Sequence, residues 1–215
     1  SALVISETTA NMKFIADAPA VIYSTMSVLK NTIATDGLDS AAIVINLKDR
    51  YNNPITNKQV IIQSLRGTTV DTLTNNGILI TNNDGACTAF ISSLTAGAAQ
   101  IKIIRPLELV DSFVTVTFTP TSVYDTNSTI SANPTELTAD SASISTIRIT
   151  LKDTNNNLIP NIFVKLASNR GDSDFIMYAN GRNDGDTTNA QGEVIAYLKS
   201  ALAGTATIYV VEPTG

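Results

Sequence analysis

Apolar and polar residues alternate over short runs throughout the chain. The clearest runs are Ile43-Val44-Ile45-Asn46-Leu47 and Ile147-Arg148-Ile149-Thr150-Leu151, in which every second residue is aliphatic. A period of two is typical of a strand with one buried face. Clusters of Asn, Asp, Gly and Pro, such as Asn52-Asn53-Pro54, separate the runs, and no sustained helical period occurs. The pattern predicts an all-β protein made of antiparallel sandwiches, with almost no helix.

The chain also repeats itself. Residues 36–67 match residues 140–171 at an offset of 104, and after a three-residue insertion residues 85–97 match 192–204 at an offset of 107. Such self-similarity indicates two homologous domains of about 100 residues each. We expect an immunoglobulin-like domain 1 at residues 19–120 and an immunoglobulin-like domain 2 at residues 121–215, joined near Thr119 to Tyr124.

The repeat register pairs the core positions that the alternation predicts. In domain 1 these are Ile43, Ile45, Leu47, Val60, Ile62, Cys87, Ala89, Ile91 and Ile101, and in domain 2 they are Ile147, Ile149, Leu151, Val164, Leu166, Val194, Ala196, Leu198 and Ile208. The single cysteine, Cys87, aligns with Val194, which predicts a buried apolar thiol.

Several ordered motifs carry a family resemblance. Each repeat has an alternating strand that ends in Lys-Asp, an Asn-rich turn, a Thr-Asn-x-x-Gly turn at 81–85 or 188–192, and an Ala-Gly turn at 96–97 or 203–204. This order resembles bacterial immunoglobulin-like repeats of group 1, the Big-1 domains that build the stalks of invasin- and intimin-like surface adhesins. Two positions depart from the family pattern, Ser141 after Asp140 and Gln191 where the first repeat has Asp84.

The resemblance implies an extracellular, non-enzymatic rod of sandwiches on the bacterial cell surface, with no cofactor. The composition also favours a non-enzymatic protein. The 215 residues include no His and no Trp, which excludes imidazole catalysis, and one Cys excludes an intrachain disulfide or a multi-Cys zinc site. A net charge of -5 argues against nucleic-acid partners and against binding to an anionic membrane.

When the two repeats are aligned, one predicted strand at the start of the chain belongs to neither domain. Asn11, Met12, Lys13 and Phe14 align with residues 115–118, the predicted last strand of domain 1. Residues 1–18 are therefore predicted to hold the last strand of a preceding repeat, or a donor strand. Domain 2 is correspondingly predicted to lack its own last strand.

Two acidic features are candidate binding sites. Asp172, Asp174, Asp184 and Asp186 could offer oxygen ligands to Ca²⁺, although their spacing differs from that of a twelve-residue calcium loop and favours a solvated acidic loop. Arg170-Gly171-Asp172 is the tripeptide known for integrin recognition, but Arg66-Gly67 at the same place in domain 1 indicates a turn feature of the repeat.

These observations lead to one function and one alternative. The first is a non-enzymatic structural stalk segment of a bacterial cell-surface adhesin. Its partners would be neighbouring repeats and, for the whole adhesin, a host-cell or matrix ligand. The alternative is a subunit of an extracellular, pilus-like filament, in which residues 1–14 of one copy complete domain 2 of the next by strand addition.

Overall fold

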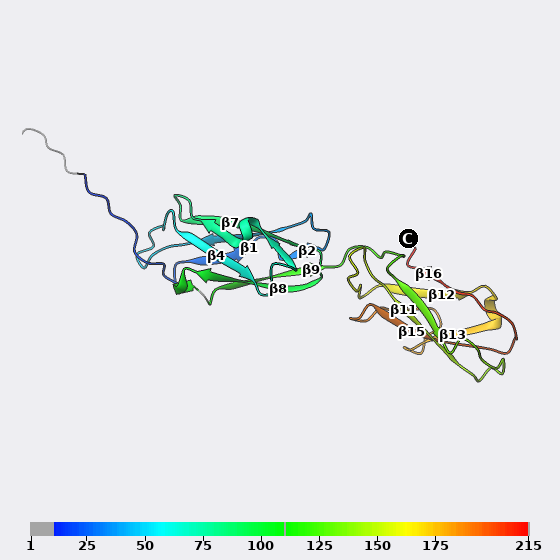
Figure 1. Ribbon diagram of the computed structural model, residues 1–215. Coiled ribbons are helices and arrows are strands. Elements are labelled where there is room, and N and C mark those ends of the chain that lie inside the picture. The colour runs from blue at the N-terminus through cyan, green and yellow to red at the C-terminus, as the bar shows by residue number, and fades with distance from the viewer. Residues whose placement is uncertain (1–10, 110, 215) are drawn as a thin grey trace, which may run out of the picture.

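Two β-sandwiches lie end to end and are joined by one short linker (Figure 1). The computed structural model describes residues 11–109 and 111–214. The described residues form strands and three short 3-10 turns, η1 (Thr74–Gly77), η2 (Leu107–Leu109) and η3 (Gly171–Ser173). The prediction of an all-β pair of immunoglobulin-like sandwiches is confirmed.

Domain 1 packs a four-stranded sheet on a five-stranded one. The first sheet has the order β1-β3-β7-β5 and the second β2-β9-β8-β4-β6. The strands are β1 (Thr25–Val28), β2 (Thr32–Ala34), β3 (Ala41–Asn46), β4 (Gln59–Ser64), β5 (Asp71–Leu73), β6 (Ile78–Ile80), β7 (Ala86–Ser93), β8 (Gly97–Arg105) and β9 (Phe113–Thr119). All neighbours are antiparallel except β2 and β9, which run parallel.

Domain 2 repeats this plan with a smaller second sheet. Its sheets have the orders β10-β11-β15-β13 and β14-β12-β16. The strands are β10 (Thr129–Asn133), β11 (Ser145–Thr150), β12 (Phe163–Ser168), β13 (Asp174–Tyr178), β14 (Asp186–Thr187), β15 (Glu193–Ser200) and β16 (Ile208–Glu212). Within the described residues β16 forms one edge of its sheet, whereas its counterpart β8 lies inside the larger sheet of domain 1.

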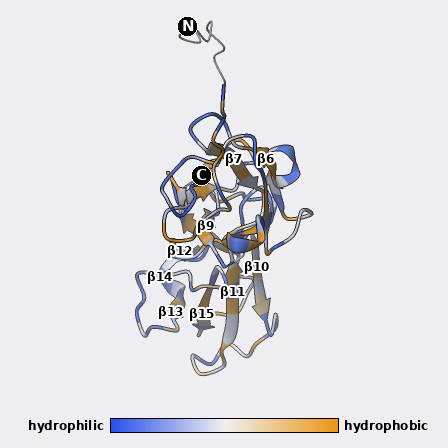
Figure 2. Ribbon diagram, turned by 90° about the vertical axis from the view of Figure 1, so that its left-hand side faces the viewer, coloured by the Kyte–Doolittle hydropathy of each residue, from blue (hydrophilic) through white to orange (hydrophobic). Residues whose placement is uncertain are grey.

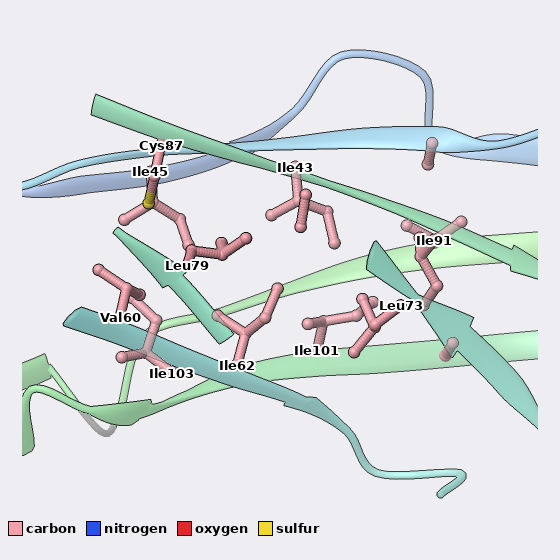
Figure 3. Packing of buried hydrophobic residues seen from close by; sticks show 14 of the residues in the cluster. Ile43, Ile45, Val60, Ile62, Leu73, Leu79, Cys87, Ile91, Ile101 and Ile103 are labelled. Atoms are coloured by element: carbon pink, nitrogen blue, oxygen red, sulfur yellow. The ribbon is translucent and has the colours of Figure 1, made fainter. Parts of the chain in front are cut away.

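The core of each domain lies between its two sheets. Figure 3 shows the aliphatic side chains of domain 1 meeting there, among them Ile43 from β3, Ile62 from β4 and Ile101 from β8. All nine predicted core residues of domain 1 are buried. Seven of the nine in domain 2 are buried, but Leu198 and Ile208 are only partly so, because the space beside them is not filled.

The hydropathy of the chain follows this layering. Hydrophobic residues gather on the strands, and the connecting loops are mostly hydrophilic (Figure 2). In the part of the chain that the structure describes, no helix has the length and apolar character needed to cross a membrane.

Two glycines at equivalent turns allow the chain to pass close to a strand end. Gly85 and Gly192 have φ of 73° and 66°, and a Cβ atom would lie 2.6 Å from the Leu47 carbonyl oxygen in the first case and 2.8 Å from that of Leu151 in the second. Only glycine avoids both the clash and the strain. The Thr-Asn-x-x-Gly motif therefore reflects backbone packing in both repeats.

Cys87 should be inert in the folded protein. Its side chain belongs to the core, and burial raises the pKa of its thiol to about 11, so the thiolate is scarce at neutral pH. We expect a disulfide-exchange reagent at pH 8 to label Cys87 much more slowly in the native chain than in the chain unfolded by guanidinium. Equal rates would contradict the burial of this residue.

Candidate functional site: the domain junction and an open groove

A buried carboxylate holds the two domains together. Asp153 follows the strand β11 and is 0% exposed. Its Oδ2 atom lies 3.1 Å from the Thr35 hydroxyl of domain 1 and accepts a hydrogen bond of 3.1 Å from the amide of Thr121 in the linker. Its Oδ1 atom accepts the amides of Asn155 and Asn157, each at 2.9 Å. One side chain thus fixes its own turn, the linker and the neighbouring domain.

Asn157 adds contacts from the same turn. Its Oδ1 atom accepts the Ala96 amide at 2.8 Å, and its Nδ2 group donates to the Leu94 carbonyl at 2.9 Å, both in domain 1. Asn155 donates to the Thr35 carbonyl at 2.6 Å. The Asp153–Asn157 turn and these residues of domain 1 form a polar contact that we call the junction.

The junction requires Asp153 to be ionised. Burial alone would raise the pKa of this carboxyl, but the hydrogen bonds from Asn157, Thr121 and Asn155 outweigh that effect and lower it below its ordinary value. Because charged acceptors make stronger hydrogen bonds than neutral ones, the ionised form favours the docked arrangement.

The far end of domain 1 carries the same turn, which contacts no other domain among residues 11–109 and 111–214. Asp49 is 1% exposed, accepts the Tyr51 and Asn53 amides through Oδ1, and accepts the Asp17 amide at 3.0 Å through Oδ2. Asp17 precedes domain 1 as Thr121 precedes domain 2, 104 residues later. Hydrogen bonds from Asn53 and from the Asp17 and Tyr51 amides outweigh the effect of desolvation and lower the pKa of Asp49 to about 2.

A second recurring feature is an ion pair inside each domain. Arg66 pairs with Asp71 and Arg170 pairs with Asp174, and both carboxylates are fully shielded from solvent. The two arginines also donate to loop carbonyls, those of Thr95 and Ala96 in domain 1 and of Leu202 and Gly204 in domain 2. Each pair, with the hydrogen bonds of its arginine, therefore links a turn to a second loop of the same sandwich.

Ion pairs engage two of the four aspartates that the sequence singled out as candidate calcium ligands. Asp174 is engaged by Arg170 and Ser168, and Asp184 pairs with Arg182 on the surface. Asp172 lies in η3, and Asp186 lies in β14. Within the described ranges no three acidic or other metal-ligating side chains come together. In the Arg170-Gly171-Asp172 tripeptide the arginine is held by the Asp174 ion pair.

In domain 1 the strand β9 fills the space between β8 and β2. It pairs antiparallel with β8 and parallel with β2, and its residues Val116 and Phe118 point inward and are 0% and 1% exposed. The Phe118 ring lies under the Arg66 guanidinium, 5.0 Å from its central carbon. β9 thus closes the sandwich on this side.

The same space in domain 2 is a groove of about 760 Å³. Residues 136–138, the counterparts of β2, line one side, and Ile208 of β16 lines the other, with Arg170, Asp174 and Leu198 among the remaining lining residues. Leu137 is 41% exposed, whereas its counterpart Ile33 is 1% exposed. We call this site the groove; it explains why Leu198 and Ile208 are only partly buried.

The segment that the sequence marked as a surplus strand is exposed. Asn11, Met12, Lys13 and Phe14 pair with no strand among the described residues, and Phe14 and Met12 are 88% and 79% exposed. Residues 1–10 lie outside the described residues. The assignment of this segment to a preceding repeat or to a donor strand stays a prediction.

Sequence reasoning did not identify the junction. The signal was present in the recurrence of an acid and an amide four residues apart, Asp49 with Asn53 and Asp153 with Asn157. By itself this recurrence predicts only a turn. The pairing partners Thr35, Leu94 and Ala96 lie on separate loops, so their proximity follows from the fold rather than from any local pattern.

Comparison with known families supports the architecture. Residues 23–122 match the family described as bacterial Ig-like domain (group 1), and residues 124–212 match the family described as invasin, domain 3. Domain 1 is therefore similar to the bacterial Ig-like domains of group 1, and domain 2 is similar to the third domain of invasin.

Individual relatives are larger proteins. The chain is 28% identical over 195 residues to the inverse autotransporter adhesin YeeJ of Escherichia coli (strain K12), covering 90% of the chain but 8% of YeeJ. Invasin, described as a bacterial integrin-binding protein, has a similar fold with a TM-score of 0.67 and 20% identity, over 92% of the chain and 38% of invasin. InvD of Yersinia pseudotuberculosis gives a TM-score of 0.66 and 22% identity, over 89% of the chain and 53% of InvD.

Removing the Asn157 side chain should loosen the junction. Asn157→Ala deletes the hydrogen bonds to Leu94 and Ala96, which should weaken the docking of the domains by about 1–3 kcal/mol. The matched control is Asn53→Ala, which removes the equivalent amide from domain 1 without touching a neighbouring domain. Small-angle scattering should show a broader distribution of maximum dimensions for Asn157→Ala only; equal behaviour of both variants would contradict the role of the junction.

Lowering the pH should weaken the junction. Because the folded pKa of Asp153 is lowered, its contribution to stability is complete above the unfolded value of about 3.9 and is lost as the pH falls towards the folded pKa. Asp153→Asn should lower the free energy of unfolding of domain 2 by about 2 kcal/mol at pH 7.

Urea unfolding at several pH values checks this, because the difference between wild type and Asp153→Asn should shrink below pH of about 4. A difference that is independent of pH would show that the ionised carboxylate is not the stabilising group.

Proposed function

We propose that the chain is a structural stalk segment of a bacterial cell-surface adhesin. The observation that carries the proposal is the junction, in which a buried carboxylate and two amide side chains from one domain hydrogen-bond the loops of the other. A stalk has to keep its repeats in line, and directional hydrogen bonds at the domain boundary restrict bending.

The internal ion pairs support a load-bearing role. Arg66–Asp71 and Arg170–Asp174 cross-link separate loops within each domain, so a pull on one loop is shared with the sandwich. Breaking a buried pair by removing one partner typically costs 3–5 kcal/mol. The similarity to the inverse autotransporter adhesin YeeJ supports a location on the cell surface.

The proposed role is not enzymatic. The core of domain 1 is filled by its own side chains, and the two carboxylates with lowered pKa that we have described, Asp49 and Asp153, hold turns, linkers and the junction.

Single-molecule stretching tests the stalk. Pulled between its ends, the chain should unfold in two separate events, each releasing about 100 residues or roughly 35 nm of contour length. Arg170→Leu should lower the force for one event and leave the other as a control within the same molecule. One cooperative event, or attachment of the isolated chain to host cells with the affinity of a complete adhesin, would contradict a stalk role.

A second candidate is the filament subunit, in which a strand from one copy completes domain 2 of another. Within the described residues β16 forms a sheet edge beside the groove, and this favours the second candidate because a sheet edge is a template for strand addition. Electron microscopy of the purified chain separates the two candidates: head-to-tail filaments support the second, and single particles at high concentration contradict it.

A further inference from the structure

The outer face of one sheet of domain 2 carries an apolar patch between two opposite charges, and we infer that this face is a contact surface for a second copy of the chain. The face belongs to the sheet β10-β11-β15-β13 and points away from the core. In the contact, two such faces stack with their strands in opposite directions. The inference goes beyond the proposed stalk function, because it assigns a partner to the side of the domain.

The middle of this face is apolar. Ile195 and Tyr197 of β15 point outward, because the residues that alternate with them face the core. Met177 lies opposite Tyr197 on the neighbouring strand β13 and is 37% exposed, and Phe175 on the same strand is 46% exposed. We call these four residues the outer patch. An exposed group of large apolar side chains marks a surface on which a partner can bury area.

Domain 1 forms the same sandwich without an equivalent patch. At the offset of 107, the counterparts of Ile195 and Tyr197 are Thr88 and Phe90. The outward residue of β5, the counterpart of β13, is the hydroxyl-bearing Thr72. Because the fold is achieved with these smaller and more polar residues, the outer patch is a feature of domain 2 that folding does not explain.

Two opposite charges flank the patch along β15. The outward residues of this strand are, in order, Glu193, Ile195, Tyr197 and Lys199. When two copies of this row meet with opposite strand directions, Glu193 of each copy lies over Lys199 of the other. The apolar residues then meet each other in the middle. The counterparts of the two charged residues in domain 1 are Ala86 and Ser92, so this order of charges is also specific to domain 2.

The order of charges favours one arrangement of the two faces. Faces that met with parallel strands would place Glu193 over Glu193 and Lys199 over Lys199, and like charges repel. Opposite strand directions make two attractive pairs that are related by a two-fold axis. The contact is therefore between identical surfaces and closes as a dimer.

Both charged side chains are accessible for such pairs. The Nζ atom of Lys199 lies 5.3 Å from the centre of the Phe175 ring and makes no ion pair with the described residues. Glu193 pairs with Arg148 at 2.7 Å, and its side chain keeps 26% of its surface exposed. A second cation can therefore approach the Glu193 carboxylate from the partner face.

The strand directions determine how the two chains run. β11 ends at the junction, because Asp153 follows it, and β15 runs antiparallel to β11. Glu193 therefore lies at the end of domain 2 near the linker, and Lys199 lies towards the other end. In the dimer the two copies of domain 1 extend from opposite ends of the contact and do not collide.

This arrangement has a consequence that rests on the proposed function. Stalks on one cell run in the same direction, whereas stalks on two facing cells run towards each other. A contact between oppositely directed chains therefore joins adhesins of two cells rather than neighbours on one cell. Self-association of the isolated chain does not depend on that consequence.

One sheet face makes a weak contact. Four partly exposed apolar side chains bury less than the about 800 Å² per partner that is typical of a stable complex. We expect dimers in solution at roughly 0.1–1 mM chain, which corresponds to a weak dissociation constant. Many copies on one surface should bind another such surface more tightly, because multivalency raises the effective concentration.

Charge exchange tests the contact and its direction. Lys199→Glu and Glu193→Lys should each weaken dimerisation about tenfold or more, because each variant brings like charges together. A 1:1 mixture of the two variants should form heterodimers, and the chain with both substitutions should dimerise like wild type. Sedimentation velocity at the expected concentrations measures all four, and thermal unfolding confirms that each variant is folded.

A substitution in the patch has a matched control in domain 1. Tyr197→Thr should weaken dimerisation, whereas Phe90→Thr, at the counterpart position, should leave it unchanged. A wild-type chain that is monomeric at these concentrations would overturn the inference. So would self-association that neither Lys199→Glu nor Tyr197→Thr weakens, because the copies would then meet through another surface.

Coated beads test the contact between opposed surfaces. Beads that carry wild-type chain should cluster. Beads with Lys199→Glu should not cluster alone but should cluster with beads that carry Glu193→Lys, and failure of the mixed beads to cluster would contradict the pairing of these two residues. Stretching the Lys199→Glu chain tests the stalk role separately, since that role requires no contact between copies.

Discussion

The carboxylate that follows β3 in domain 1 and β11 in domain 2 is the constraint on which the arrangement of the whole chain depends. Asp153 is buried and must be ionised and fully hydrogen-bonded to be tolerated there, since an unpaired buried charge is very costly. Its partners come from three places, its own turn, the linker and domain 1. Satisfying this one group therefore fixes where the linker runs and where the next domain sits.

Domain 1 contains an equivalent carboxylate. Asp49 orders its own turn and the preceding linker in the same manner, but its end of domain 1 has no neighbour among the described residues. Repeats of this kind can thus be joined in series through the same set of hydrogen bonds at each boundary. The ion pairs Arg66–Asp71 and Arg170–Asp174 act within the domains and make each sandwich a stable unit between two such boundaries.

Much of the fold followed from the sequence because alternation and repetition are local signals. The runs around Ile43 and Ile147 predicted the strands, and the repeat register predicted the core of domain 1 without error. Leu198 and Ile208 were predicted to be as buried as their counterparts, but they are only partly buried. The alternation of apolar residues does not show whether a strand lies over them, although the repeat register predicted that domain 2 lacks its last strand. The junction escaped prediction for a similar reason, because Thr35 and Asn157 are 122 residues apart and only the fold brings them together. The recurring Arg-Gly dipeptide predicts a turn in each domain. It does not predict the ion pairs of Arg66 with Asp71 and of Arg170 with Asp174, which the structure shows.

The central claim is that the junction makes the two domains a single stiff unit. Residual dipolar couplings of the wild-type chain at neutral pH test it most directly. If the junction is formed in solution, one alignment tensor should fit the couplings of both domains in the relative orientation seen in the structure. Couplings that require two tensors of different magnitude would show that the domains move independently, and would contradict the account.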